Sequence, residues 1–205
     1  MSEPAHRPLP IFPLGTVLFP DGVLPLRIFE ARYMDMVRDC LRDQLEFGVC
    51  LITQGSEVGQ PAEHESLGCS ARIEHWDMAQ LGLLNIRTRG TRRFEVVSRT
   101  VTDTGLILAE VAPLPPEPDE PVPRAYIDCV RLLERIVQDL NEREPDPIKR
   151  PIGEPFHYDS ASWVSYRLSE FVPMTGAAKA RLLALNDPIA RLRILDEYLR
   201  QQKVI

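Results

Sequence analysis

Hydrophobic and polar residues alternate along much of the chain between residues 9 and 113. The clearest run has an apolar side chain at every second position: Leu67, Cys69, Ala71 and Ile73. A period of two predicts β-strands with one buried face. Similar short runs occur at residues 24–28, 47–52, 94–96 and 107–109, separated by Gly, Pro and Asp residues. Many short strands at this spacing predict a closed or nearly closed barrel rather than a doubly wound sheet.

A helical period replaces the alternation at one place in this region and again after Pro113. Tyr33, Val37 and Cys40 predict a helix that starts near Glu30. Later apolar stripes predict helices over residues 126–140, 160–172, 175–185 and 188–199. Two of these helices have clear start signals. Thr175 can cap one, and Asp187 followed by Pro188 places a capping carboxylate before a proline in the first turn of the other.

Prolines mark the change from strands to helices. Six of the eleven residues 113–123 are proline and three others are acidic, which predicts a semi-rigid linker. We therefore expect an α+β protein with a β-barrel lobe over residues 8–113, a proline-rich linker over 114–123 and a helical bundle over 124–203.

Composition narrows the possible partners. The chain of 205 residues has a formal net charge of −6, which disfavours non-specific binding of nucleic acid or anionic membrane. Its four cysteines are widely spaced among apolar neighbours, as expected for reduced, buried thiols in a cytoplasmic protein rather than for a metal site. Residues 1–8 lack the pattern of a secretory signal, and no apolar run approaches the ~20 residues of a membrane span.

The common catalytic motifs are missing from the sequence. It contains no glycine-rich phosphate loop and no GxSxG elbow. Serines between Ser160 and Ser169, with Lys179 nearby, suggest a Ser-Lys dyad, but their helical spacing favours packing or solvent-facing roles. His64 lies between two glutamates in a stretch that we interpret as a surface loop. We expect no catalytic residue, no cofactor and no metal ion.

Two groups of residues are candidates for binding. A basic cluster around Gly90 is the best anion or RNA candidate, although it also fits the outward face of a hairpin: Arg87, Arg89, Arg92 and Arg93. Several aromatic residues fit either the core or a groove between the two lobes that would bind apolar peptide segments: Phe19, Phe29, Tyr33, Trp76, Trp163 and Phe171.

The first forty residues contain a specific family signature. The segment LPIFPLGTVLFP, residues 9–20, closely resembles the opening of the N-terminal, substrate-recognising domain of Lon proteases. The similarity continues through LGCSARI at 67–73 and GTRRF at 90–94, and more weakly through WVSYRL at 163–168 and KARLLAL at 179–185.

The resemblance implies a PUA-like pseudo-barrel followed by a helical bundle. It implies a stand-alone bacterial protein that binds polypeptide or a protein partner, without the ATPase and peptidase domains of Lon, so no enzymatic activity is expected. Within the signature, Arg27 and Glu30 flank a strand-to-helix corner and could pair across it.

The sequence is compatible with two other functions. A PUA-like protein could bind RNA through the arginine cluster, although the net acidity disfavours this. A hydrolase with an unrecognised site is the second alternative, because a fold by itself does not define a function.

Overall fold

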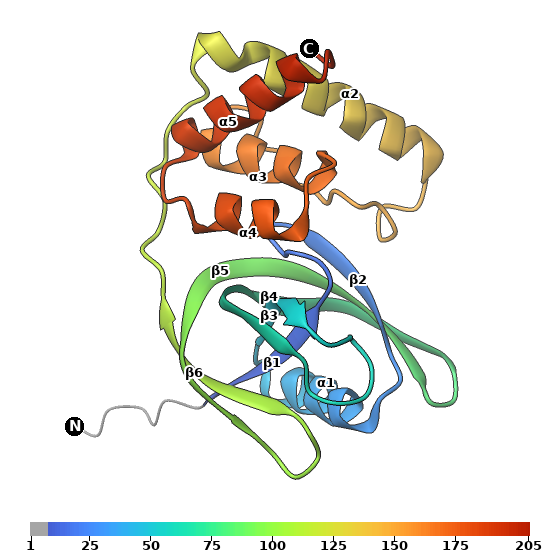
Figure 1. The fold of residues 1–205 in the computed structure, drawn as a ribbon. Helices are drawn as coiled ribbons and strands as arrows, with labels where there is room; N and C mark the ends of the chain where they lie inside the picture. Colours follow the sequence, from blue (N-terminus) through green and yellow to red (C-terminus); the bar gives the residue numbers. More distant parts are fainter. Residues whose placement is uncertain (1–7) are drawn as a thin grey trace, which may run out of the picture. The chain divides into compact units, whose positions relative to one another are not determined.

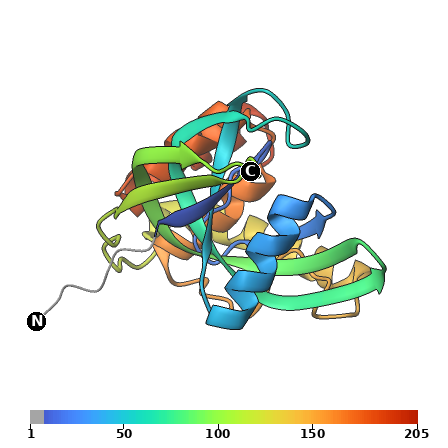
Figure 2. The same cartoon turned by 90° about the horizontal axis from the view of Figure 1, so that it is seen from below.

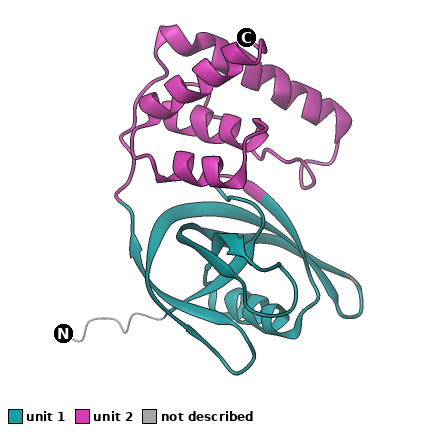
Figure 3. Cartoon of the chain, in the orientation of Figure 1, with its two compact units in different colours: residues 1–18, 24–114 teal, residues 19–23, 115–205 magenta. Residues whose placement is uncertain are grey.

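The structure is a computed structural model that describes residues 8–205. Within these residues the chain forms two compact units (Figure 3). The barrel unit runs up to Leu18 and continues over Leu24–Leu114, and the helical unit contains Phe19–Val23 and Pro115–Ile205. The fold is the mixed α+β class that the sequence predicts.

Six strands in the described residues form the sheet of the barrel unit (Figure 1). They are β1 (Leu9–Leu14), β2 (Val23–Ile28), β3 (Phe47–Gln54), β4 (Glu63–Gln80), β5 (Leu83–Val101) and β6 (Ile107–Pro113). Their order is β2-β5-β4-β3-β1-β6. β1 is parallel to β3 and antiparallel to β6, and β6 pairs in turn with β5. This last pairing closes β5, β4, β3, β1 and β6 into a barrel, and β2 adds to β5 outside the ring.

The long strand β5 makes this closure possible. Its first part, Leu83 to Glu95, pairs with β4, and its last part, Phe94 to Val101, pairs with β6. A single strand therefore belongs both to the hairpin and to the seam of the barrel. Figure 2 shows the hairpin of β4 and β5 projecting past α1.

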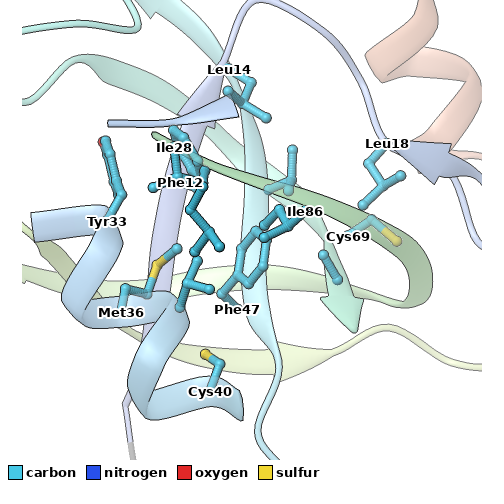
Figure 4. Packing of buried hydrophobic residues seen from close by; sticks show 14 residues of the cluster. Phe12, Leu14, Leu18, Ile28, Tyr33, Met36, Cys40, Phe47, Cys69 and Ile86 are labelled. Atoms are coloured by element: carbon cyan, nitrogen blue, oxygen red, sulfur yellow. The ribbon is translucent and has the colours of Figure 1, made fainter. Parts of the chain in front are cut away.

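Helix α1 (Ala31–Asp43) supplies one side of the main barrel core. Its buried residues include Tyr33, Met36 and Cys40, which follow the helical period of the sequence (Figure 4). The ring of Tyr33 stacks on Phe12 of β1, with ring centroids 3.9 Å apart. Burial of these apolar side chains against the strands stabilises the unit by removing them from water.

A smaller core surrounds Phe94 of β5. Gly48 and Gly68 lie directly against its ring, since a Cβ built on either glycine would come within 2.6 Å of the Phe94 Cζ atom. Both positions require glycine because any side chain would overlap the ring.

The helical unit contains a short 3-10 turn, Arg124–Tyr126, and four helices of the described residues. They are α2 (Ile127–Arg143), α3 (Ala161–Phe171), α4 (Gly176–Ala184) and α5 (Pro188–Gln201). The two predicted caps are confirmed: the Thr175 side chain accepts a hydrogen bond from the Ala178 N–H, and Asp187 accepts one from the Ala190 N–H.

The segment Phe19–Val23 packs within the helical unit, although its flanking residues belong to the barrel unit. Phe19 is fully buried, with its ring centroid 5.5 Å from that of Tyr166 in α3. The buried Arg167 donates from Nη2 to the Pro20 carbonyl at 2.5 Å. These contacts attach the connection between β1 and β2 to α3.

No helix within residues 8–205 is long and apolar enough to cross a membrane. The first seven residues, which lack the sequence pattern of a secretory signal, lie outside the described residues.

Candidate functional site

A cavity of about 820 Å³ lies within the barrel unit, bounded by α1, β1, β5 and β6. Its apolar lining residues include Leu9, Met36, Phe94, Leu106, Leu108 and Val111. Its charged lining residues are Arg32, Asp35, Asp39, Glu46, Arg92 and Arg93. Apolar walls with a few charged groups are typical of ligand sites.

Two arginines of the predicted basic cluster reach this cavity because β5 contains a bulge. Cys69 of β4 pairs with Arg93 and Ala71 pairs with Gly90, so Thr91 and Arg92 together oppose the single residue Ser70. Side chains of consecutive strand residues normally point to opposite faces, and a bulge breaks this alternation. Arg92 and Arg93 consequently line the same cavity although they are neighbours in sequence.

Thr91 fixes the bulge with its side-chain hydroxyl. The Thr91 Oγ1 atom donates to Glu46 Oε2 at 2.9 Å and lies 3.3 Å from the Ser70 carbonyl oxygen. These contacts join β5 to β4 and to the residues before β3, so the bulge has defined partners.

The other two arginines of the cluster have a structural role. Arg89 donates from Nε to Glu74 Oε1 at 2.5 Å, and Arg87 lies 3.9 Å from the other oxygen of Glu74. Arg87 and Arg93 are both buried, so the expectation that all four arginines lie on the outward face of a hairpin is wrong. The contact between Arg87 and Glu74 follows from the register of β4 and β5, because Arg87 is opposite His75, the residue after Glu74.

Arg32 is a buried cation in the first turn of α1. It pairs with Glu30 at 3.0 Å and donates to the Gly105 carbonyl at 2.9 Å, while its Nε atom has no hydrogen-bond partner among the described residues. From the sequence Glu30 could pair with Arg27 across the corner, and the structure pairs it with Arg32. A cation near a helix N-terminus is unfavourable for the helix dipole, so the Glu30 carboxylate compensates it.

Exposed apolar residues gather at the far end of the hairpin of β4 and β5. Trp76 is 59% exposed, and Met78 and Leu81 are also exposed. Phe29, directly after β2, is exposed as well. In the antiparallel pairing Trp76 is opposite Ile86, whose side chain is buried in the main core while that of Trp76 is exposed. We call Trp76, Met78 and Leu81 the hairpin tip.

The remaining aromatic candidates are less accessible. Phe19, Tyr33 and Trp163 are buried, and Phe171 is partly buried. Trp163 packs in an aromatic cluster with Phe156 and Tyr158. Phe29 and Trp76 thus lie at the surface of the barrel unit. The buried residues Phe19, Tyr33 and Trp163 have packing roles.

The serines considered for a dyad are occupied by helix contacts. Ser160 Oγ accepts the Trp163 N–H, Ser165 Oγ donates to the Ser162 carbonyl, and Lys179 Nζ donates to the Glu170 carbonyl. None of these contacts joins a serine to the lysine. No three His, Cys, Asp or Glu side chains within residues 8–205 are grouped to hold a metal ion.

The family comparison decides the relationship. A family model of the ATP-dependent protease La (LON) substrate-binding domain matches residues 8–201. The chain belongs to this family. A comparison with curated proteins found no match.

Solved structures of LON family members agree with this assignment. A crystal structure of a Lon N-terminal domain protein from Xanthomonas campestris is 36% identical, with a TM-score of 0.74. The match covers 93% of this chain and 97% of that one. The N-terminal domain of the Mycobacterium avium complex Lon protease has the same fold at 19% identity, with a TM-score of 0.59 and coverage of 94% and 97%. This chain is therefore a LON substrate-binding domain over nearly its whole length.

Sequence reasoning missed the cavity. Its apolar wall comes from four separate elements, and the bulge that aims Arg92 and Arg93 into it has no signature in the chain. The only available signal was the pair of adjacent arginines after Gly90 and Thr91.

Proposed function

We propose that this LON family protein is a non-catalytic binding module that holds extended, apolar segments of other polypeptides. The observation that carries the proposal is the hairpin tip, where Trp76, Met78 and Leu81 expose apolar surface on a projecting hairpin. Monomeric proteins seldom gather large apolar side chains at one exposed place unless they bind a partner there. The family match supports a protein or polypeptide partner.

Apolar contacts fit this surface better than RNA contacts do. RNA recognition needs unpaired cations beside aromatic platforms on which bases can stack. Here Arg87 and Arg89 already pair with Glu74, and the chain has a net charge of −6. Association that grows with the apolar content of the polypeptide and changes little with salt is the expected behaviour.

The test measures binding of a fluorescently labelled, permanently unfolded polypeptide to the full chain. We expect the double substitution W76S/L81S to weaken binding at least tenfold, since each removed side chain loses roughly 1.5–3 kcal/mol of apolar burial. Val97→Ser is the matched control, because Val97 is an exposed apolar residue of β5 away from the tip.

The proposal is wrong if the wild-type protein does not bind the unfolded polypeptide, or if W76S/L81S binds as tightly as V97S. Strong, salt-sensitive binding of a short RNA with no binding of the polypeptide would favour the RNA alternative instead.

The proposal also includes the absence of enzymatic activity and a cytoplasmic location. Four buried cysteines that form no disulfide support a reducing compartment. A peptidase and esterase screen of the purified protein, with and without ATP, tests the first part. Turnover that is lost on substitution of residues in this chain would contradict it.

A further inference from the structure

The cavity of the barrel unit has the size and lining of a specific ligand site. Its volume of about 820 Å³ lies within the ~300–1,000 Å³ of typical ligand pockets. Leu108 and Val111 of β6 line it together with Leu106, which precedes this strand, and Leu9 of β1. This wall suits an aliphatic side chain.

The carboxylates around the cavity already have partners. Asp35 accepts a hydrogen bond from Arg38 at 2.7 Å, and Asp39 pairs with Arg42 at 3.1 Å. Glu46 accepts the Thr91 hydroxyl. The negative charges of Asp35 and Asp39 are therefore compensated by arginines of α1 that do not line the cavity.

Two arginines of the cavity, Arg92 and Arg32, have hydrogen-bonding capacity left. Arg92 is exposed and has no partner among the described residues. Arg32 is 7% exposed, and its Nε atom is buried without a hydrogen-bond partner, which is costly for a charged group. Arg93, 5% exposed, lies beside Arg92 in the lining because of the bulge. Charge complementarity thus favours a ligand with an anionic group.

A polypeptide C-terminus combines the features that this lining requires. Its carboxylate matches the planar fork of a guanidinium, which can bind both oxygens. Its last side chain follows directly and can contact the aliphatic wall. An internal peptide segment lacks the terminal charge, and a nucleic-acid phosphate lacks the aliphatic group.

We propose that this cavity binds the C-terminal residue of a partner polypeptide, with Arg92 holding the carboxylate and the β6 wall holding an aliphatic last side chain. This inference rests on the proposed function and names the part of the polypeptide that the barrel unit recognises. The hairpin tip would contact apolar residues of the partner in a separate interaction.

The test compares two labelled hexapeptides that end in Leu and differ only in a free C-terminal acid or an amide. Fluorescence anisotropy with the full chain is expected to show at least tenfold tighter binding of the acid. Arg92→Gln should reduce the affinity for the acid to that for the amide, because it removes the charge and keeps much of the side-chain volume. Arg72→Gln is the matched control, since Arg72 is an exposed arginine of β4 outside the cavity.

A second pair of variants tests the aliphatic wall. Leu108→Ala should weaken binding of the Leu-ended acid severalfold, whereas Val97→Ser, outside both the cavity and the hairpin tip, should leave it unchanged. Circular dichroism melting checks that L108A is folded at the assay temperature, and R92Q keeps the proposal testable if it is not.

The outcomes separate this inference from the proposed function. Equal binding of acid and amide, or an unchanged affinity in R92Q, overturns the cavity proposal. If those results occur while the unfolded polypeptide still binds through the hairpin tip, only the cavity proposal fails. Binding of the acid that depends on Arg92, without binding of the unfolded polypeptide, supports the cavity and overturns the role of the hairpin tip.

Discussion

Arg191 of α5 holds both carboxylate oxygens of Glu117, a residue 74 positions earlier in the proline-rich stretch before α2. Its Nη1 donates to Oε1 at 2.9 Å and its Nη2 donates to Oε2 at 2.5 Å. Tyr166 and Ser162 of α3 also donate to this carboxylate. Arg191 is fully buried, and its guanidinium stacks on the Tyr166 ring. The stretch is thereby fixed to α3 and α5 of the helical unit.

We expect Glu117→Ala to destabilise the helical unit by about 3 kcal/mol. The substitution leaves the buried Arg191 charge without its carboxylate, and loss of one partner of a buried pair typically costs roughly 3–5 kcal/mol. Urea denaturation followed by circular dichroism measures the effect. Asp128→Ala is the control, because the exposed Asp128–Arg131 pair should contribute less than about 1 kcal/mol. An E117A midpoint equal to that of D128A would contradict the expectation.

Glu170 of α3 should make stability decrease as pH rises from 5 to 8. Burial raises the pKa of Glu170 from 4.5 to about 7, and Asp21 adds to this, although Arg167 and Lys179 oppose it. Between pH 4.5 and 7 the folded state therefore holds a proton that the unfolded state releases. Because the folded state binds more protons, the free energy of unfolding falls with rising pH in this window, by about 3 kcal/mol in total.

Denaturation of wild type and E170Q at several pH values measures this dependence. The difference in stability between the two should change across pH 5–8, since the Gln side chain does not titrate. Glu95→Gln, at an exposed position of β5, controls for the loss of a charge elsewhere. Parallel pH profiles of wild type and E170Q would show that Glu170 does not titrate in this range.

Gly68→Ala should destabilise the barrel unit by roughly 2 kcal/mol, since it overpacks a filled core. The new Cβ atom would come within 2.6 Å of the Cys50 Sγ atom, the Phe94 Cζ atom and the Val49 carbonyl oxygen. Gly15→Ala is the control, because its Cβ would meet only the flexible end of Glu57, at 3.2 Å. Thermal melting of both variants decides the matter, and a G68A melting temperature equal to that of G15A would count against this account of the core.

The thiols should react with a disulfide reagent only after unfolding. All four cysteines are buried, and burial raises the pKa of Cys50 and that of Cys129 to about 12. At pH 8 very little of either thiol is then the reactive thiolate. We expect less than one thiol per chain to react within an hour in buffer and all four to react in guanidinium. Fast reaction of the native protein would show that a cysteine is accessible.

Local signals in the chain predicted the elements well. Alternation in residues 67–73 predicted a strand of the barrel, and Asp187 with Pro188 predicted the start of α5, because period and capping depend on neighbouring residues alone. The fold class and the family resemblance are confirmed.

These local signals do not predict contacts between residues that are far apart in the sequence. The cavity depends on a bulge whose extra residue can be located only when β4 and β5 are paired. Pairing of Glu30 with Arg32 instead of Arg27 depends on how the chain turns into α1. Burial of Phe19 depends on α3, which begins more than 140 residues later. Alternation and capping rules contain no information about such distances.

The place of Phe19–Val23 has a practical consequence for dissecting the protein. A truncation after Leu114 would remove Tyr166 and Arg167, which cover Phe19 and hold Pro20, and would leave an unsupported apolar connection between β1 and β2. The barrel expressed alone should therefore aggregate more readily than the full chain, and replacing residues 19–23 by a short polar turn is the rational remedy.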